Sequence, residues 1–204
     1  MKGKVYITRL SQGDPVETIK NKFSRLLSES ASFDFIRHGD NVAIKVHFGE
    51  EGNTGFVKPE YTRLVCDLLK EKQASFFLTD TNTLYKGART NCADHLKLAY
   101  EHGFTSDIAG AQVIIPDDSK TENVAHVAIN QQFIKEAKVA RIFLEAGALV
   151  SIAHFKGHIM TGFGGALKNI GMGCAARTGK LAQHSDVSPF VRTKACIGCF
   201  ICVK

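Results

Sequence analysis

The sequence lacks the features that carry a chain into or across a membrane. No apolar run approaches the roughly 18 residues that a membrane-spanning helix needs. The first ten residues, MKGKVYITRL, contain neither a long apolar core nor a small-residue cleavage site, so they do not resemble an export signal. We therefore expect no membrane partner and a cytoplasmic location.

The sequence also lacks a concentrated block of charge. The formal net charge is +6, but nowhere do five or six basic residues stand together. The charge suits an anionic partner, and its even spread gives no support for nucleic-acid binding.

Length and composition fit one globular domain with a small appendage. The 204 residues are 44% hydrophobic and 23% charged, which is ordinary for a globular protein. Residue patterns predict strands at 4–10, 41–48, 75–79, 112–116, 124–129, 141–144 and 148–153, and helices at 15–27, 59–72, 92–102 and 132–139. This alternation predicts an α/β fold with a mainly parallel, Rossmann-like sheet and flanking helices. We place the α/β domain at residues 1–193 and a separate segment at 194–204.

Polar residues follow several of the predicted strands. In parallel sheets, ligands bind beyond the carboxyl ends of the strands. The polar residues expected at that edge are His47, Glu50, Glu51, Asp80, Asn82 and His154. Of these, we expect His47 and Asp80 to bind the ligand.

Residues 151–185 form an unusual glycine-rich stretch. It holds seven glycines, three histidines and three lysines and no acidic residue. Each glycine costs about 0.5–1 kcal/mol relative to alanine inside a helix or strand, so packing alone does not account for the composition. We expect the backbone to approach a ligand here, with histidines and a lysine for proton transfer, metal coordination or anion binding. The candidate ligand-binding residues are Gly162, Gly164, Gly165 and Asn169, and the candidate catalytic residues are His158, Lys168 and His184.

Neither common phosphate loop is present in this stretch. A P-loop needs glycine before Lys168 and serine or threonine after it, and a dinucleotide fingerprint needs glycine at position 167, which is leucine. An exposed backbone nest beside Lys168 can still hold an anionic group. The alternative is that Lys168 is an ordinary solvated lysine. We interpret the scattered histidines, namely His38, His95, His102 and His126, as structural.

The last cysteines form a motif at the end of the chain. Six cysteines without an export signal argue against a disulfide framework. Cys196, Cys199 and Cys202 have the spacing C-x2-C-x2-C, which begins the bacterial ferredoxin run and suits a [4Fe–4S] cluster. The next cysteine of the run would fall two residues past Lys204, so we expect a truncated segment whose cluster is absent or incomplete here. A zinc site or a redox C-x-x-C pair are the alternatives.

These motifs together resemble a known family. The run from His158 through Gly162-Phe-Gly-Gly-Ala-Leu-Lys168-Asn-Ile-Gly-Met-Gly, followed by Gly179-Lys180, Gln183-His184 and CIGCFIC, resembles the DUF362 family of iron–sulfur proteins. The resemblance covers nearly the whole chain. It implies an α/β domain followed by ferredoxin-like clusters, and it implies no settled activity.

The same stretch has a more distant similarity to the nickel-pincer lactate racemase family. His158 lies ten positions before Lys168, and His184 lies sixteen after it. The resemblance implies that Lys168 anchors a nickel cofactor, that His184 ligates the metal and that His158 is an acid or base. The racemase family places a further histidine in the loop after the third strand, but residues 80–89 contain none. That family also lacks the cysteine tail, so the likeness favours a shared ligand-binding scaffold over racemisation itself.

Three functional hypotheses follow. The leading one is an iron–sulfur redox protein or oxidoreductase that binds a small anionic substrate or cofactor at residues 154–184 and exchanges electrons with a redox partner protein. The second is an isomerase or racemase of the nickel-pincer type. The third is a non-enzymatic anion-binding module in which the cysteines are only a structural staple.

Overall fold

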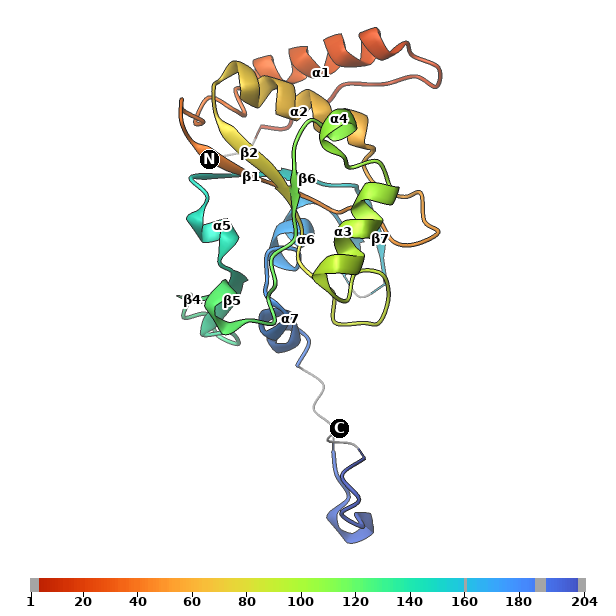
Figure 1. The fold of residues 1–204 in the computed structure, drawn as a ribbon, viewed down its shortest axis with the longest axis vertical. Helices are drawn as coiled ribbons and strands as arrows, with labels where there is room; N and C mark the ends of the chain where they lie inside the picture. Colours follow the sequence, from red (N-terminus) through yellow and green to blue (C-terminus); the bar gives the residue numbers. More distant parts are fainter. Residues whose placement is uncertain (1–3, 160, 186–189, 202–204) are drawn as a thin grey trace.

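The computed structural model describes residues 4–159, 161–185 and 190–201 and has an α/β architecture. Its centre is a four-stranded parallel sheet in the order β3-β2-β1-β6 (Figure 1). The strands are β1 (Asn41–Val46), β2 (Ser75–Thr79), β3 (Val113–Ile114) and β6 (Ala148–Ile152). The parallel sheet expected from the sequence is confirmed, and each of these strands lies within its predicted range.

Strand β1 lies in the middle of the sheet and separates two apolar cores. Because side chains alternate along a strand, Val42 and Ile44 belong to the larger core, while Ala43 belongs to a smaller one that contains Phe143. Burial of both faces explains the apolar sequence of the strand. Lys45 lies on the same face as Ala43 and is only 1% exposed, so a charged side chain interrupts this core.

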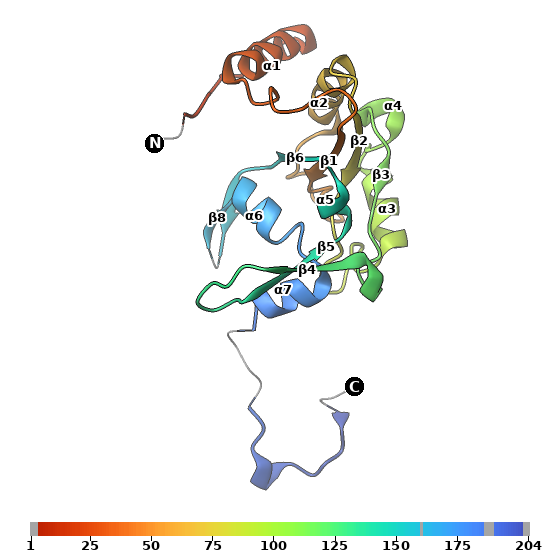
Figure 2. The same cartoon turned by 90° about the vertical axis from the view of Figure 1, so that its left-hand side faces the viewer.

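Helices cover the face of the larger core. They are α1 (Val16–Ser30), α2 (Pro59–Glu71), α3 (Cys92–Glu101) and the short α4 (Ser106–Ala109), and α1 lies outside α2 (Figures 1 and 2). Helix α3 begins where the Asn91 side chain accepts the Asp94 N–H at 3.0 Å, and it is followed by Gly103 with a φ of 87°. The three long helices predicted for this part of the chain are confirmed.

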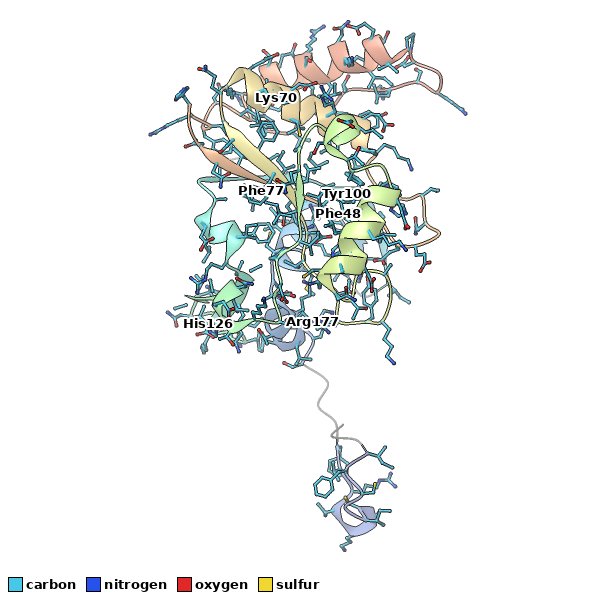
Figure 3. The ribbon with its side chains drawn as sticks, in the orientation of Figure 1. Phe48, Lys70, Phe77, Tyr100, His126 and Arg177 are labelled. Atoms are coloured by element: carbon cyan, nitrogen blue, oxygen red, sulfur yellow. The ribbon has the colours of Figure 1, made fainter. Side chains whose placement is uncertain are left out.

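The larger core reaches the carboxyl end of β1. Phe48, labelled in Figure 3, follows the strand and packs edge-on against His95 and Phe104, with ring centroids 5.8 Å and 4.9 Å apart. Such edge-to-face pairs add to the burial of the rings. The loop that starts at Gly49 therefore leaves the sheet from a firmly packed strand end.

An antiparallel hairpin replaces the helix predicted at residues 132–139. Strand β4 (Val124–Ala128) was predicted, but it pairs with a second strand, β5 (Glu136–Ala140). The register runs from Val124 opposite Ala140 to Ala128 opposite Glu136. The helix prediction is wrong because the backbone pairing with β4 outweighs the local helical preference of this segment.

Two further strand predictions are wrong. Residues 4–10 have no regular structure, and Val5 and Ile7 are each 82% exposed. Their alternating pattern has no neighbouring strand to pair with among the described residues, so it does not form a sheet edge. Residues 141–144 contain most of the short helix α5 (Ile142–Glu145), in which the Leu144 N–H donates to the Arg141 carbonyl at 2.9 Å.

The glycine-rich stretch follows β6 and folds over the other face of the sheet. It forms the hairpin β7 (Lys156–His158) and β8 (Gly162–Gly164), then α6 (Ala166–Gly171) and α7 (Arg177–Gln183). Helix α6 contacts β1 and β6 on the side of the sheet opposite α2 (Figure 2). Short 3-10 turns, η1 (Thr121–Asn123) and η2 (Thr193–Ala195), complete the elements. No helix in the described residues is both long enough and apolar enough to cross a membrane.

Candidate functional site

A pocket of about 680 Å³ lies at the carboxyl ends of β1, β2 and β6. Strand order reverses here, because β2 and β3 lie on one side of β1 while β6 lies on the other. Such a switch point is the usual ligand position in open α/β sheets. The polar residues that line the pocket are Lys45, His47, Glu50, Asp80, Thr81, Thr83, Tyr85, Arg89, His154, Lys156, His158, Lys168, Asn169, Lys180 and His184.

The structure brings most of the candidate residues to this one pocket. His47, Asp80 and His154 arrive from the ends of three strands, as the sheet topology predicted. The three candidate catalytic residues arrive from the glycine-rich stretch, with Gly164, Gly165 and Asn169 beside them. Gly162 begins β8 with a φ of 74° and does not line the pocket, so the hairpin turn accounts for it. The roles of all these residues stay predictions.

A buried ion network forms the floor of the pocket. The Asp80 carboxylate lies 3.0 Å from Lys45 Nζ through Oδ1 and 2.9 Å from Arg89 Nη2 through Oδ2. All three side chains are more than nine-tenths buried. Burial alone would raise the pKa of Asp80, but the charges of Lys45 and Arg89 outweigh it and hold that pKa well below its usual value. The carboxylate is therefore ionised at neutral pH.

The network continues into the wall of the pocket. Arg89 also contacts Glu50 and donates to His95 Nε2 at 3.3 Å, and the Tyr85 hydroxyl donates to Glu50 at 2.5 Å. Burial lowers the pKa of His95 to about 4, so its ring is neutral and its Nδ1 donates to Asn82 Oδ1 at 3.3 Å. His95 and Asn82 thus lie beneath the pocket and support it.

Asn169 ties α6 to the sheet. Its Oδ1 accepts from Lys45 Nζ at 2.7 Å, and its Nδ2 donates to Ser151 Oγ at 2.8 Å and to the Ile152 carbonyl at 3.2 Å. The amide joins the ends of β1 and β6 to the helix that carries Lys168. The predicted ligand-binding role of Asn169 is accompanied by a structural one.

Gly173 makes room for the buried lysine. A Cβ atom at this position would lie 2.2 Å from Lys45 Cε and 2.2 Å from the Asn169 carbonyl oxygen. Real Cβ atoms do not come so close to other heavy atoms. Glycine is therefore required here for packing against the protein's own side chain and backbone.

The two candidate histidines hold opposite tautomers. His158 Nδ1 accepts the Thr161 N–H at 3.2 Å, which places the proton of the neutral ring on Nε2. His184 Nδ1 lies 2.8 Å from the Lys180 carbonyl, an acceptor only, so Nδ1 carries the proton and Nε2 has the lone pair. Desolvation, followed by the charges of Lys168 and Lys156, lowers the pKa of His158.

Lys168 lies in a partly desolvated, cationic environment. Burial, followed by the charge of Lys156, lowers its pKa. In the described part of the chain neither lysine forms an ion pair. The pocket lining includes five lysines and arginines but only two carboxylates. This charge balance favours an anionic ligand.

Several site residues have no clear signal in the sequence. Lys45 lies inside an apolar strand, and this misplaced charge is the one signal that points to it. Arg89 and Lys180 look like ordinary surface residues until the fold buries them. Glu51 is exposed and does not line the pocket.

The cysteine tail lies apart from the α/β body in Figures 1 and 2. Cys196 and Cys199 are exposed and carry free thiols, while Cys202 lies outside the described residues. Within the described ranges, no three His, Cys, Asp or Glu side chains are grouped to hold a metal ion. The cluster and the boundary at residue 194 stay predictions.

Comparison with known proteins identifies the family and the fold. A family model described as a domain of unknown function, DUF362, matches residues 42–197. The structure is similar to the lactate racemase apoprotein from Thermoanaerobacterium thermosaccharolyticum, with a TM-score of 0.55 and 18% sequence identity. The match covers 74% of this chain but only 34% of the racemase chain, so it supports the α/β fold alone. No curated protein sequence matches the chain.

Replacing Asp80 with asparagine tests the buried ion network. D80N removes the carboxylate that pairs with the buried Lys45 and leaves Arg89 with Glu50 alone, and we expect a loss of about 3–5 kcal/mol in unfolding free energy at pH 7. The folded pKa of Asp80 is below its unfolded value, so its stabilisation is present above about pH 4 and is lost as the pH falls further. Urea unfolding at neutral and acidic pH measures both effects.

The D67N variant is the matched control, because it removes a carboxylate whose ion pair, with Arg63, lies partly exposed at the surface. We expect D67N to change stability by less than about 1 kcal/mol. Equal stability of D80N and the wild type at pH 7 would contradict the network.

Gly173→Ala tests the close packing around Lys45. We expect a loss of about 1–3 kcal/mol in unfolding free energy, because the added methyl group must displace the Asn169 carbonyl or Lys45. Gly171→Ala is the control, since its Cβ would meet nothing within 4 Å. Chemical unfolding of both variants measures the difference, and a Gly173→Ala protein as stable as Gly171→Ala would show that the packing is loose.

Proposed function

The chain belongs to the DUF362 family, and we propose that it binds a small anion in the pocket for redox chemistry supplied by an iron–sulfur cluster on its cysteine tail. The anion is a carboxylate or phosphate-type substrate or an anionic cofactor. The observation that carries the proposal is the pocket itself, which gathers Lys168, His158 and His184 above the buried Lys45–Asp80–Arg89 network.

The charges of the pocket support an anionic ligand. Lys45 and Arg89 are already paired with carboxylates, whereas Lys156 and Lys168 have no ion pair among the described residues. Burial, followed by repulsion from the ammonium of Lys156, lowers the pKa of Lys168. An anion between them relieves this repulsion and gains two charge-assisted contacts.

The histidines support proton transfer at the bound molecule. His158 carries its ring proton on Nε2, and His184 presents an unprotonated Nε2. His158 can therefore donate a hydrogen bond from Nε2, or a proton once its ring is protonated, and His184 can accept a proton or ligate a metal through Nε2. This division needs no rearrangement of either imidazole.

The cysteine tail has the donors that an iron–sulfur cluster needs. Cys196 and Cys199 are exposed thiols, and between them Gly198 turns the chain with a φ of 69°. Thiolate ligands on a tight turn match the ferredoxin pattern, with Cys202 as the third ligand. When bound, the cluster supplies one-electron transfer.

A second candidate function is a cofactor-dependent isomerase of the nickel-pincer type. It is favoured by the position of Lys168, whose amine lines the pocket and has no hydrogen-bond partner among the described residues. A lowered pKa makes this amine more nucleophilic, which suits covalent attachment. His184 Nε2 would be the metal ligand.

Protection of Lys168 tests the anion site. We expect oxalate or sulfate to slow acetylation of Lys168 by acetic anhydride, because the bound anion covers the amine and favours its protonated form. Peptide mass spectrometry follows the reaction, with the exposed Lys20 of α1 as an internal control. Equal slowing at both lysines, or at neither, would argue against an anion site. A mass adduct already present on Lys168 in protein from its own host would favour the nickel-pincer candidate.

Cysteine variants test the redox proposal. Anaerobic reconstitution with iron, sulfide and a small thiol should give a broad visible absorption that bleaches on reduction. We expect the C196S/C199S double variant to lose this absorption and its iron, because two of the three cluster ligands are gone. C92S is the control, since Cys92 lies on α3 and forms hydrogen bonds with Asn82 and Pro116. A colourless wild-type protein that binds zinc stoichiometrically would overturn the redox proposal.

A further inference from the structure

Lys180 is a buried cation with no carboxylate partner in the part of the chain that the structure describes. It lines the pocket, yet only 7% of the residue is exposed. Its ammonium donates to Thr81 Oγ1 and to the Ala175 carbonyl at 2.7 Å. In residues 4–159, 161–185 and 190–201, no carboxylate oxygen lies within 4.0 Å of its nitrogen. Two of its three N–H groups thus have neutral acceptors, and the third has no acceptor among the described residues.

Helix α7 holds Lys180 in this position. A Cβ atom on Gly179 would lie 2.2 Å from the Lys138 carbonyl oxygen, so the helix lies directly against β5. The Ala176 N–H donates to that same carbonyl at 3.0 Å. At the start of the helix, near the Arg177 label in Figure 3, the Asp118 carboxylate accepts the Arg177 N–H at 2.9 Å. These contacts hold the backbone of Lys180 beside the pocket.

A buried ammonium without a counter-charge costs free energy. The hydroxyl of Thr81 lies 2.9 Å and 3.1 Å from the Gly173 and Ala175 carbonyls, so its hydrogen is used there and its lone pair faces Lys180. The surroundings are thus built from acceptors that suit an ammonium but do not neutralise it. An anion entering the pocket would provide the missing charge and the third acceptor.

We propose that Lys180 binds the anionic group of the pocket's ligand through the third N–H of its ammonium. The ligand class is a carboxylate or a phosphate-type oxyanion. This inference rests on the proposed anion-binding function. It adds that the ammonium of Lys180 makes the main contact with the bound anion. The geometry carries it: the side chain is buried, lines the cavity and has no carboxylate partner among the described residues.

The charge of Lys180 changes in an accessible pH range. Burial lowers its pKa to about 8, against the opposing effects of Asp80 and Asp118. The ionisable groups that surround it are Asp80, Asp118, Lys45, Arg89, Cys174 and His184. The pKa of Asp80 lies well below its usual value and that of Cys174 is raised to about 11, so neither changes charge near pH 8.

Calorimetric titration with sulfate and with oxalate tests the inference, because both anions keep their charge between about pH 7 and pH 9.5. Wild-type affinity should fall as the pH rises through about 8, where Lys180 loses its proton. Lys180→Met should weaken binding at pH 7 by about ten- to a hundredfold, the usual loss of a charged hydrogen bond. It should also remove the pH dependence near pH 8. Methionine has similar length and no charge to desolvate, so we expect a folded protein, and thermal unfolding checks this.

Lys168→Met is the matched control. It should weaken binding but keep the fall in affinity near pH 8, because Lys180 remains. A K180M protein that binds both anions as tightly as the wild type at pH 7, or that keeps the pH dependence, would overturn the inference alone. Absence of wild-type binding to either anion would overturn the anion pocket and this inference with it. A K180M effect on sulfate alone supports a phosphate-type ligand, and an effect on oxalate alone supports a carboxylate.

Discussion

The contact of Lys45 and Arg89 with Asp80 is the constraint on which the rest of the site depends. The three groups come from β1, from the end of β2 and from the following loop, and they are buried where water cannot screen them. Moving charged groups out of water costs free energy, and the attraction between the three groups offsets that cost only if they keep their geometry. Asn169 extends that geometry to α6 and β6. These contacts hold the pocket floor together without a ligand.

The ion pairs of the pocket floor occupy the carboxylates that line the pocket. Arg89 also contacts Glu50, so the two carboxylates of the pocket are committed to Lys45 and Arg89. The lysines contributed by β7, α6 and α7 then face a cavity whose described lining has no further carboxylate. A site with an excess of positive charge attracts anions electrostatically, and the shape of the site then discriminates among them.

From the sequence, the residues that meet at the pocket could be predicted better than the buried ion network beneath them. The strand ends at His47, Asp80 and His154 could be placed together because parallel strands end at a common edge. The burial of Lys45 and Arg89 could not be foreseen, because it depends on which loops close over the sheet. The segment at 132–139 was misread for a related reason: its strand is stabilised by pairing with β4, and a local pattern contains no information about its partner.

The glycines of residues 151–185 have two different roles, one toward the pocket and one in packing. Their number suggested close approach of the backbone to a ligand, and Gly164 and Gly165 do line the pocket. Gly173 and Gly179, however, lie against Lys45 and against the Lys138 carbonyl, both parts of the protein itself. In each case a glycine makes room for a lysine of the pocket lining: Gly173 for Lys45 directly, and Gly179 for Lys180 by letting α7 lie against β5. Glycine in this stretch therefore positions cations as well as leaving space for a ligand, and substitutions at Gly173 or Gly179 would disturb binding through the lysines and not through direct contact.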